Sequence, residues 1–288
     1  MDDVIERAVL RVIESMHENL GDQITVDDMA RTAMFSKFHF SRVFQRVTGL
    51  SPGRFLSAVR LGEAKRLLAS TSLSITNISH QVGYSSVGTF SSRFTSSVGL
   101  SPSRYRLLKS VTAQSLDDGR ARVAPGPAVT VRGTVTSPLK DRPIFAGLFP
   151  DRILEGRPVC YTLLDGPGPY VLENVPEGRW HLIAQSVAPG YEDAVRHRPG
   201  DGDALCLARR PVTVGPDAGP QLADVELRPM RPLDPPVLLA LRDLLSASDP
   251  ARTGRPAEEE EEEEEPDRPA LAVCPARPAD ALTGGGRY

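Results

Sequence analysis

The sequence predicts a multidomain chain: an all-α double helix-turn-helix region, then a small all-β sandwich, then a disordered acidic tail. Three observations lead to this prediction. Residues 40–55 and 90–105 repeat each other, with eight of the sixteen positions identical. Seven short strand-like runs lie between residues 129 and 231. Eight consecutive glutamates occupy residues 258–265.

The first helix-turn-helix is expected at about residues 25–47. Thr25 suits a helix N-cap, and Asp28 places a carboxylate near the positive end of the helix that follows. A short turn then leads to a second helix, which Ser36 can cap. The apolar residues of this second helix recur at helical spacing and predict a buried stripe of Phe40, Val43, Phe44 and Val47.

The second helix-turn-helix is expected at about residues 74–98, where Ser74 can cap the first helix and the Phe90/Phe94 pair repeats. Between the copies, Ser51-Pro52 begins a helix of roughly 18 residues, about 27 Å long. Such a spacer can hold two helices near the 34 Å of one DNA turn. Two copies are too few for a solenoid, which needs at least three repeats. The pattern is therefore typical of a monomeric reader of double-stranded DNA.

These residues resemble the AraC/XylS family of bacterial transcription regulators. The resemblance covers roughly residues 1–107 and rests on TVDDMA, FSRVFQRVTGLSPGRF, GEAKRLL, ITNISHQVGY and FSSRFTSSVGLSPSRYR. It implies that both recognition helices enter successive major-groove segments, and that RNA polymerase is a partner. The order found here, with the DNA-binding domain first, is the reverse of the usual one in the family.

The expected contacts fall into two groups. By resemblance and by position, the base-reading candidates are Lys37, Phe38, Ser41, Arg42, Gln45, Val87, Gly88, Ser91 and Ser92. The candidates for phosphate contacts are Arg46, Arg54, Arg93, Arg104 and Arg106. Arg42 is the strongest base reader, since a bidentate Arg–guanine contact gives about 1–3 kcal/mol of discrimination; a phosphate contact is its alternative. Phe38 suits thymine methyl groups or helix packing.

Charge divides the chain in the same way. Residues 1–110 hold 14 basic and 9 acidic residues, a net charge of +5, and the remainder holds 20 and 28, a net of −8. A basic block joined to an acidic remainder is typical of a DNA-binding module with a separate partner. The sequence therefore predicts that the second half does not touch DNA, and that a polar linker at 111–128 separates the halves.

The strand-like runs between residues 129 and 231 predict a small antiparallel sandwich. VTVRGTV and GPGPYVLENVPEGRWHLIAQSV resemble the carboxypeptidase regulatory-like, transthyretin-like sandwich. Such domains serve as scaffolds and as adhesion or sensing modules, so the fold does not give the function. A regulatory module is expected; the alternative is a module for dimerisation or protein interaction that binds no ligand.

The sequence does not predict an enzyme. His181 and His197 have no metal-binding spacing, and no nucleophile elbow or phosphate loop is found, so we expect no cofactor and no metal. A short amphipathic helix is expected at 232–248, and a disordered tail at 249–288. Without a signal peptide or a long apolar run, the sequence predicts a cytoplasmic protein that makes no membrane contact. The operator, the effector and the oligomeric state stay open.

Overall fold

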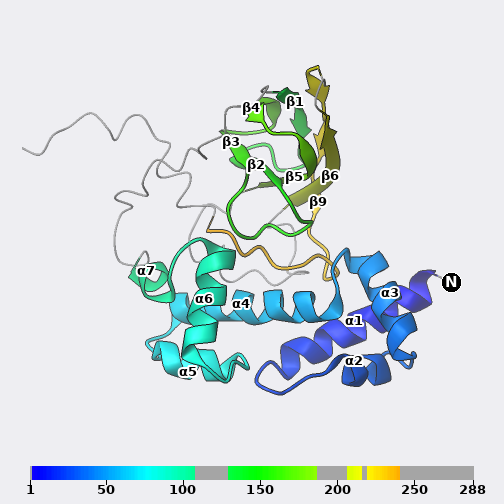
Figure 1. Cartoon of the computed structure of the whole chain (residues 1–288), viewed down its shortest axis with the longest axis vertical. Helices are drawn as coiled ribbons and strands as arrows, with labels where there is room; N and C mark the ends of the chain where they lie inside the picture. Colours follow the sequence, from blue (N-terminus) through cyan, green and yellow to red (C-terminus); the bar gives the residue numbers. More distant parts are fainter. Residues whose placement is uncertain (1, 108–128, 187–205, 216–218, 241–288) are drawn as a thin grey trace, which may run out of the picture. The chain divides into compact units, whose positions relative to one another are not determined.

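The computed structural model describes residues 2–107, 129–186, 206–215 and 219–240 (Figure 1). Of two compact units, residues 1–249 and 250–288, only the first contains described residues. The predicted linker and the predicted acidic tail lie outside the described residues. A helical region is followed by a β-rich region, as the sequence predicts.

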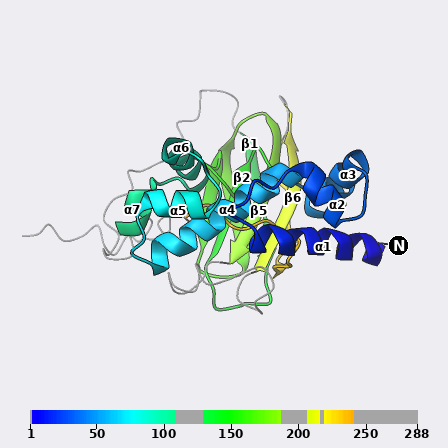
Figure 2. The ribbon, with the colours of Figure 1, turned by 90° about the horizontal axis from the view of Figure 1, so that it is seen from below.

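The helical region contains two helix pairs joined by a long helix. Its helices are α1 (Asp2–Glu18), α2 (Val26–Thr32), α3 (Lys37–Thr48), α4 (Pro52–Ser70), α5 (Ile75–Gln81), α6 (Val87–Val98) and α7 (Pro102–Leu107). The pairs α2–α3 and α5–α6 occupy the positions expected for the two helix-turn-helix copies. Figures 1 and 2 place α3 at one end of α4 and α6 at the other. With 19 residues, α4 is about 28 Å long.

Local signals begin and end these helices. The Thr25 side chain accepts a hydrogen bond from the Asp28 N–H at 3.2 Å, and the Thr25 N–H donates to the Asp28 carboxylate at 2.9 Å. This capping box satisfies two N–H groups at the start of α2. Ser36 precedes α3 but makes no side-chain cap. Gly49 and Gly99 end α3 and α6 in the left-handed conformation, with φ of 81° and 91°, which favours glycine.

Helix α1 precedes every element expected from the sequence. Its apolar residues recur at helical spacing and are buried: Val9, Val12, Ile13 and Met16. The helix packs against α2 and α3 and precedes the first helix pair, as α4 precedes the second. The two repeats differ at one equivalent position: Val43 of α3 is buried, whereas Arg93 of α6 is exposed.

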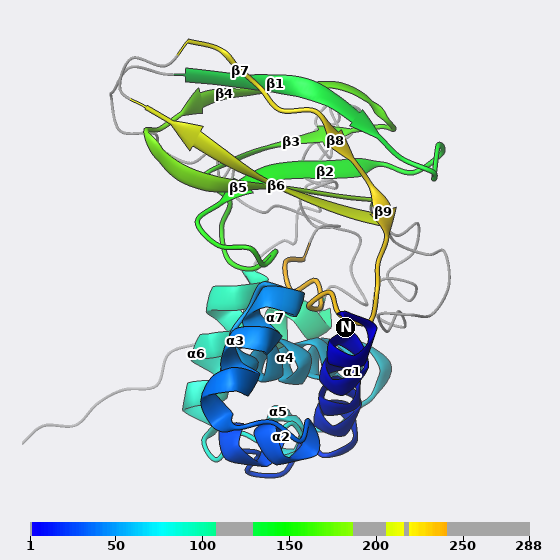
Figure 3. The same cartoon turned by 90° about the vertical axis from the view of Figure 1, so that its right-hand side faces the viewer.

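The β-rich region consists of two sheets, which Figure 3 shows as separate layers. Its strands are β1 (Val129–Thr136), β2 (Ile144–Phe149), β3 (Cys160–Leu164), β4 (Gly168–Val175), β5 (Gly178–Ser186), β6 (Cys206–Val214), β7 (Gln221–Leu222), β8 (Val225–Glu226) and β9 (Arg228–Pro229). One sheet has the order β4-β1-β7, with β8 also paired to β1, and the other has the order β3-β2-β5-β6-β9. Alternating side chains of both sheets, such as Val131 and Leu182, form one core.

The last predicted strand, ADVELRP, is instead divided between the two sheets. β7 and β8 pair with β1 in parallel, and β9 pairs with β6 antiparallel. The expectation of a purely antiparallel arrangement was therefore wrong at this edge. The chain crosses from one sheet to the other between Glu226 and Arg228, so each short strand pairs only briefly.

Strand β2 is buried along its whole length. Such a continuous apolar run is expected where both faces of a strand are covered. On the outer face, Phe145, Phe149 and Ile183 pack with Leu154 and Leu239 in a second apolar cluster. The β2–β3 loop and the segment 233–240 thus cover this face.

The helix predicted at 232–248 is absent from its described part, residues 232–240. Pro235 and Pro236 remove two backbone donors and disfavour helical geometry for the residues before them. The N–H groups of Leu238 and Leu239 donate to the Leu154 carbonyl at 3.2 and 3.1 Å, and the Ala240 N–H donates to Val98 at 3.2 Å. The segment therefore packs in a non-helical conformation, with its leucines buried.

Candidate nucleic-acid interface

The predicted base-reading residues of α3 lie mostly on an exposed face of the helix. Arg42 and Gln45 are exposed, and the Phe38 ring is 81% exposed, outside the apolar core. Lys37 is exposed too, but its Nζ lies 2.7 Å from the Asp27 carboxylate of α2. Ser41 is half-buried, and its hydroxyl donates to the Lys37 carbonyl at 2.9 Å. α3 thus presents a cation, an amide and an aromatic ring to solvent.

A second apolar side chain stands beside this face. Met34, in the turn before α3, is 85% exposed and has a positive φ of 59°. Gly83 holds the comparable left-handed position before α6, with φ of 83°. A Cβ at Gly83 would lie 2.3 Å from the Leu20 carbonyl oxygen, so the second turn requires glycine. Met34 was not among the predicted contacts, because exposure of a turn residue has no local sequence signal.

The corresponding face of α6 is small and nearly uncharged. Gly88 and Ser92 are exposed, and Val87 and Ser91 are half-buried. Arg93 is exposed and supplies the cation of this face. Two α6 hydroxyls bond back to their own helix: Thr95 donates to the Ser91 carbonyl at 2.7 Å, and Ser96 to Arg93 at 2.9 Å. α3 and α6 therefore differ in charge as well as in sequence.

Arg54, a predicted phosphate contact, is already engaged. Its guanidinium lies 3.1 Å from the Asp151 carboxylate and 2.7 Å from that of Glu155, both in the β2–β3 loop. Burial alone lowers the pKa of Arg54, but the hydrogen bonds to Asp151 and Glu155 outweigh it and raise the pKa. Two carboxylates neutralise this arginine, so the structure does not offer it to phosphate.

The other predicted phosphate contacts differ in their availability. Arg46 of α3 and Arg104 of α7 are exposed, as is Arg93. Arg106 is half-buried and donates to the Leu73 carbonyl, and its Nε is buried without a partner. Arg106 therefore joins α7 to the loop before α5, and we assign it a structural contact.

The β2–β3 loop forms a cleft against the end of α3. The cleft encloses about 330 Å³ and is lined by Gln45, Gly49, Leu50, Ser51, Arg54, Asp151, Arg152 and His181. Burial, together with the charge of Arg152, lowers the pKa of His181, so the imidazole is neutral at pH 7. No local pattern predicts that Arg152 or His181 lies near Gln45, since more than 100 residues separate them along the chain.

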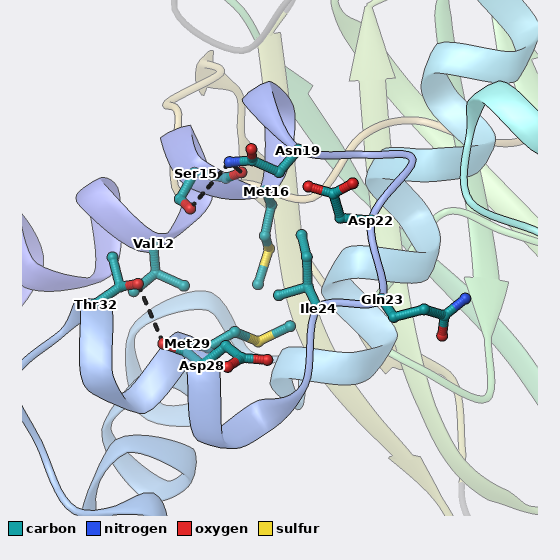
Figure 4. Close-up of a pocket in the computed structure, with 10 residues that line it drawn as sticks. All are labelled: Val12, Ser15, Met16, Asn19, Asp22, Gln23, Ile24, Asp28, Met29 and Thr32. Carbon is teal, nitrogen blue, oxygen red and sulfur yellow. Dashed lines mark hydrogen bonds between the residues drawn. The ribbon is translucent and has the colours of Figure 1, made fainter.

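A smaller cavity of about 250 Å³ lies between α1 and α2 (Figure 4). Val12, Met16 and Met29 point toward its centre, with Ile24 on one side. The Asp28 carboxylate at its rim is committed to the Thr25 cap and to an ion pair with Arg31. The polar groups of this cavity thus serve the local fold.

Two further observations concern reactive and metal-binding side chains in the part of the chain that the structure describes. No three His, Cys, Asp or Glu side chains among them are close enough to hold a metal ion. Burial raises the pKa of the Cys160 thiol to about 12, which keeps it protonated and unreactive. None of the described helices is long and apolar enough to cross a membrane.

Comparison with known proteins finds a family match in the helical region. A helix-turn-helix domain family matches residues 29–107. The lactose operon transcription activator of Staphylococcus xylosus is 33% identical over 104 residues, which are 36% of this chain and 37% of that protein. The transcriptional activator AarP of Providencia stuartii is 34% identical over 89 residues, 31% of this chain and 66% of that protein.

A solved structure, the DNA-binding domain of the transcriptional factor AdpA in complex with a target DNA, is 29% identical. The alignment covers 35% of this chain and 90% of the AdpA domain, with a TM-score of 0.34. The matched stretch spans 37% and 66% of the length of the two activators. The helical region is a helix-turn-helix domain of the AraC family.

Proposed function

We propose that this protein is a sequence-specific DNA-binding transcription regulator that reads two adjacent major-groove segments. The observation that carries the proposal is the duplicated helix pair, with exposed faces on α3 and α6 at the two ends of α4. The major groove admits an α-helix, and α4 is about 28 Å long, close to the 34 Å of one DNA turn. The activators that match this region support the assignment.

In this mechanism α3 supplies most of the sequence discrimination. Arg42 reads guanine through two hydrogen bonds, Gln45 suits adenine, and Phe38 contacts thymine methyl groups. Lys37 and Ser41 complete the face, and Arg46 contacts phosphate. α6 supplements this reading with weaker contacts from Val87, Gly88, Ser91 and Ser92. Arg93 and Arg104, which are exposed, contact the DNA backbone.

We further propose that residues 129–231 are a sandwich of the carboxypeptidase regulatory-like type that modulates the DNA-binding region. The two layered sheets with one shared core support this reading. So do the contacts of the β2–β3 loop, which reaches Arg54 at the start of α4 and, through the Gly156 N–H, the Ser97 carbonyl of α6 at 2.8 Å.

One observation favours the alternative, a module for dimerisation or protein interaction. Val171 is 50% exposed and Leu222 is 68% exposed, and both are register partners of Arg132 on β1. They therefore flank Arg132 on the outer face of the first sheet. If analytical ultracentrifugation shows a monomer both in the free protein and in the DNA complex, dimerisation through this surface is excluded.

The proposed function is tested by selecting duplexes from a random pool with the full chain. We expect enriched duplexes to share two short sequence blocks, centred about one helical turn apart on one face of the DNA. An Arg132→Gln variant serves as a control, because its exposed arginine lies on the β-rich region away from the reader helices. A pool that binds without any enriched sequence would overturn the proposal.

A further inference from the structure

The net charge of −8 beyond residue 110 does not describe the folded β-rich region. The described residues between 129 and 240 hold 10 basic and 9 acidic residues, a net charge of +1. The acidic excess lies in the remaining segments, above all in the glutamates at 258–265. Repulsion from phosphate is therefore not a property of this surface.

Four arginines of the β-rich region lie near one another, and two of them, Arg209 and Arg228, pair with a single carboxylate. Asp234 is nearly buried; its carboxylate lies 2.8 Å from Arg228 and 3.4 Å from Arg209. Arg209 also feels the charges of Arg228, Arg152 and Arg231. We call these four arginines the arginine cluster. With one carboxylate among four cations, the cluster keeps a positive surplus that an anion would neutralise.

Two members of the cluster are free to bind. Arg152 and Arg231 are exposed, and among the described residues neither side chain has an ion pair. The acidic neighbours of Arg152 in its loop, Asp151 and Glu155, are bound to Arg54. The carboxylates of the loop thus neutralise Arg54, a predicted phosphate contact, while Arg152 of the same loop stays exposed to solvent and available to an anion.

The position of Arg152 connects the cluster to the reader helix. A Cβ at Gly49, which ends α3, would lie 3.4 Å from the Arg152 Cδ. Arg152 also lines the cleft that contains Gln45, one turn from Arg42 on α3. A DNA backbone that follows the groove occupied by α3 would pass this end of the helix, where Arg152 lies.

We infer that the arginine cluster, through Arg152 and Arg231, binds the DNA phosphates next to the segment read by α3. This inference rests on the proposed function. The β-rich region then contributes to affinity and footprint without reading bases, since arginine contacts to phosphate carry no sequence information. An alternative for Arg152 is a purely structural contact with the negative end of α3.

The test compares the full chain with Arg152→Gln/Arg231→Gln and with Arg132→Gln, on a duplex selected by the wild-type protein. Fluorescence anisotropy titrations over a salt series give the slope of log K against log salt. Each lost phosphate contact makes this negative slope less steep by about 0.9, so the double variant should lose about 1.8 from the slope. If the two proteins bind equally at about 1 M salt, the double variant then binds roughly sixtyfold more weakly at about 0.1 M. The sequence preference and the thermal unfolding midpoint should not change.

If the slope of log K against log salt were the same for the double variant and for Arg132→Gln, the inference would be overturned. A fall in the unfolding midpoint with an unchanged slope, which is the result of a structural contact alone, would overturn it as well. If inorganic phosphate raises the midpoint of the wild type but not of the double variant, and the slope is unchanged, the cluster binds a small anion instead of DNA. Failure of the proposed function is distinct, because the wild-type protein would then select no duplex.

Discussion

Leu238 provides a direct test of how the β-rich region and the helical region are joined. Its side chain is fully buried and belongs to the same apolar core as the helices, together with Ile153 and Leu233. Replacement of a fully buried leucine by alanine costs about 3–5 kcal/mol, from lost burial and from the cavity that remains. The hydrogen bond of Leu238 to the Leu154 carbonyl comes from its backbone N–H, and alanine keeps this bond. We therefore expect Leu238→Ala to destabilise the fold by about 3 kcal/mol.

Urea unfolding can follow both regions in the same sample. Trp180 is the single tryptophan of the chain and lies in β5, so its fluorescence monitors the β-rich region, while circular dichroism at 222 nm monitors the helices. With a slope of about 2–3 kcal/mol per molar urea, the loss corresponds to a midpoint shift of roughly 1 M. Because Leu238 is shared by the two regions, both signals should shift together.

Leu222→Ala is the matched control, since this leucine is 68% exposed. Its effect should stay within about 0.5 kcal/mol. If the urea midpoint followed by circular dichroism were the same for Leu238→Ala and for Leu222→Ala, the reasoning would be refuted, because Leu238 would then not belong to the helical core. A shift confined to tryptophan fluorescence would refute it as well.

Two further predictions concern single side chains. Asp234→Asn should destabilise the protein by about 2–3 kcal/mol at pH 7, because Arg209 and Arg228 lose a nearly buried carboxylate. Burial alone would raise the pKa of Asp234, but hydrogen bonds, chiefly from Arg228, outweigh it and lower the pKa below 3.8. The stabilisation by the carboxylate is therefore present above pH 3.8 and is lost as the pH falls through the lowered pKa. An equal difference in urea midpoint between the wild type and Asp234→Asn at pH 7 and at pH 3 would contradict this. Arg42→Ala should weaken specific DNA binding by about 1–3 kcal/mol, and Ser92→Ala much less. A larger loss for Ser92→Ala in equilibrium titrations would assign the main reader to α6.

Sequence reasoning located the helical region well because its signals are local. The Thr25 cap with Asp28, the glycines Gly49 and Gly99, and the repeated phenylalanine pairs each act within a few residues of the chain. Duplication adds a second, independent copy of the same signals. Helix α1 has buried apolar residues at helical spacing but lies outside the repeated sequence block, and it was not predicted.

The candidate site was only partly accessible to the same reasoning. The exposure of Phe38 follows from its place outside the apolar stripe, and the structure places it there. The pairing of Arg54 with Asp151 and Glu155 joins residues about 100 positions apart and has no local signal. The leucine period after Pro236 is a comparable case. It reads as a helix, yet two prolines and backbone bonds to Leu154 and Val98 favour another conformation.

The composition of residues 111–128 predicts two halves that are physically separate, and the packing contradicts this separation. Ile153 and Leu238 are buried against the helices, so a fragment that ends near residue 110 would expose the apolar surface that they cover. Among the described residues, the β2–β3 loop reaches the ends of both reader helices: Arg152 lies at Gly49, and Gly156 bonds to Ser97. Coupling between two sites requires an element that both of them bias. The β2–β3 loop contacts both α3 and α6, so a displacement that breaks its contacts would act on the two helices together.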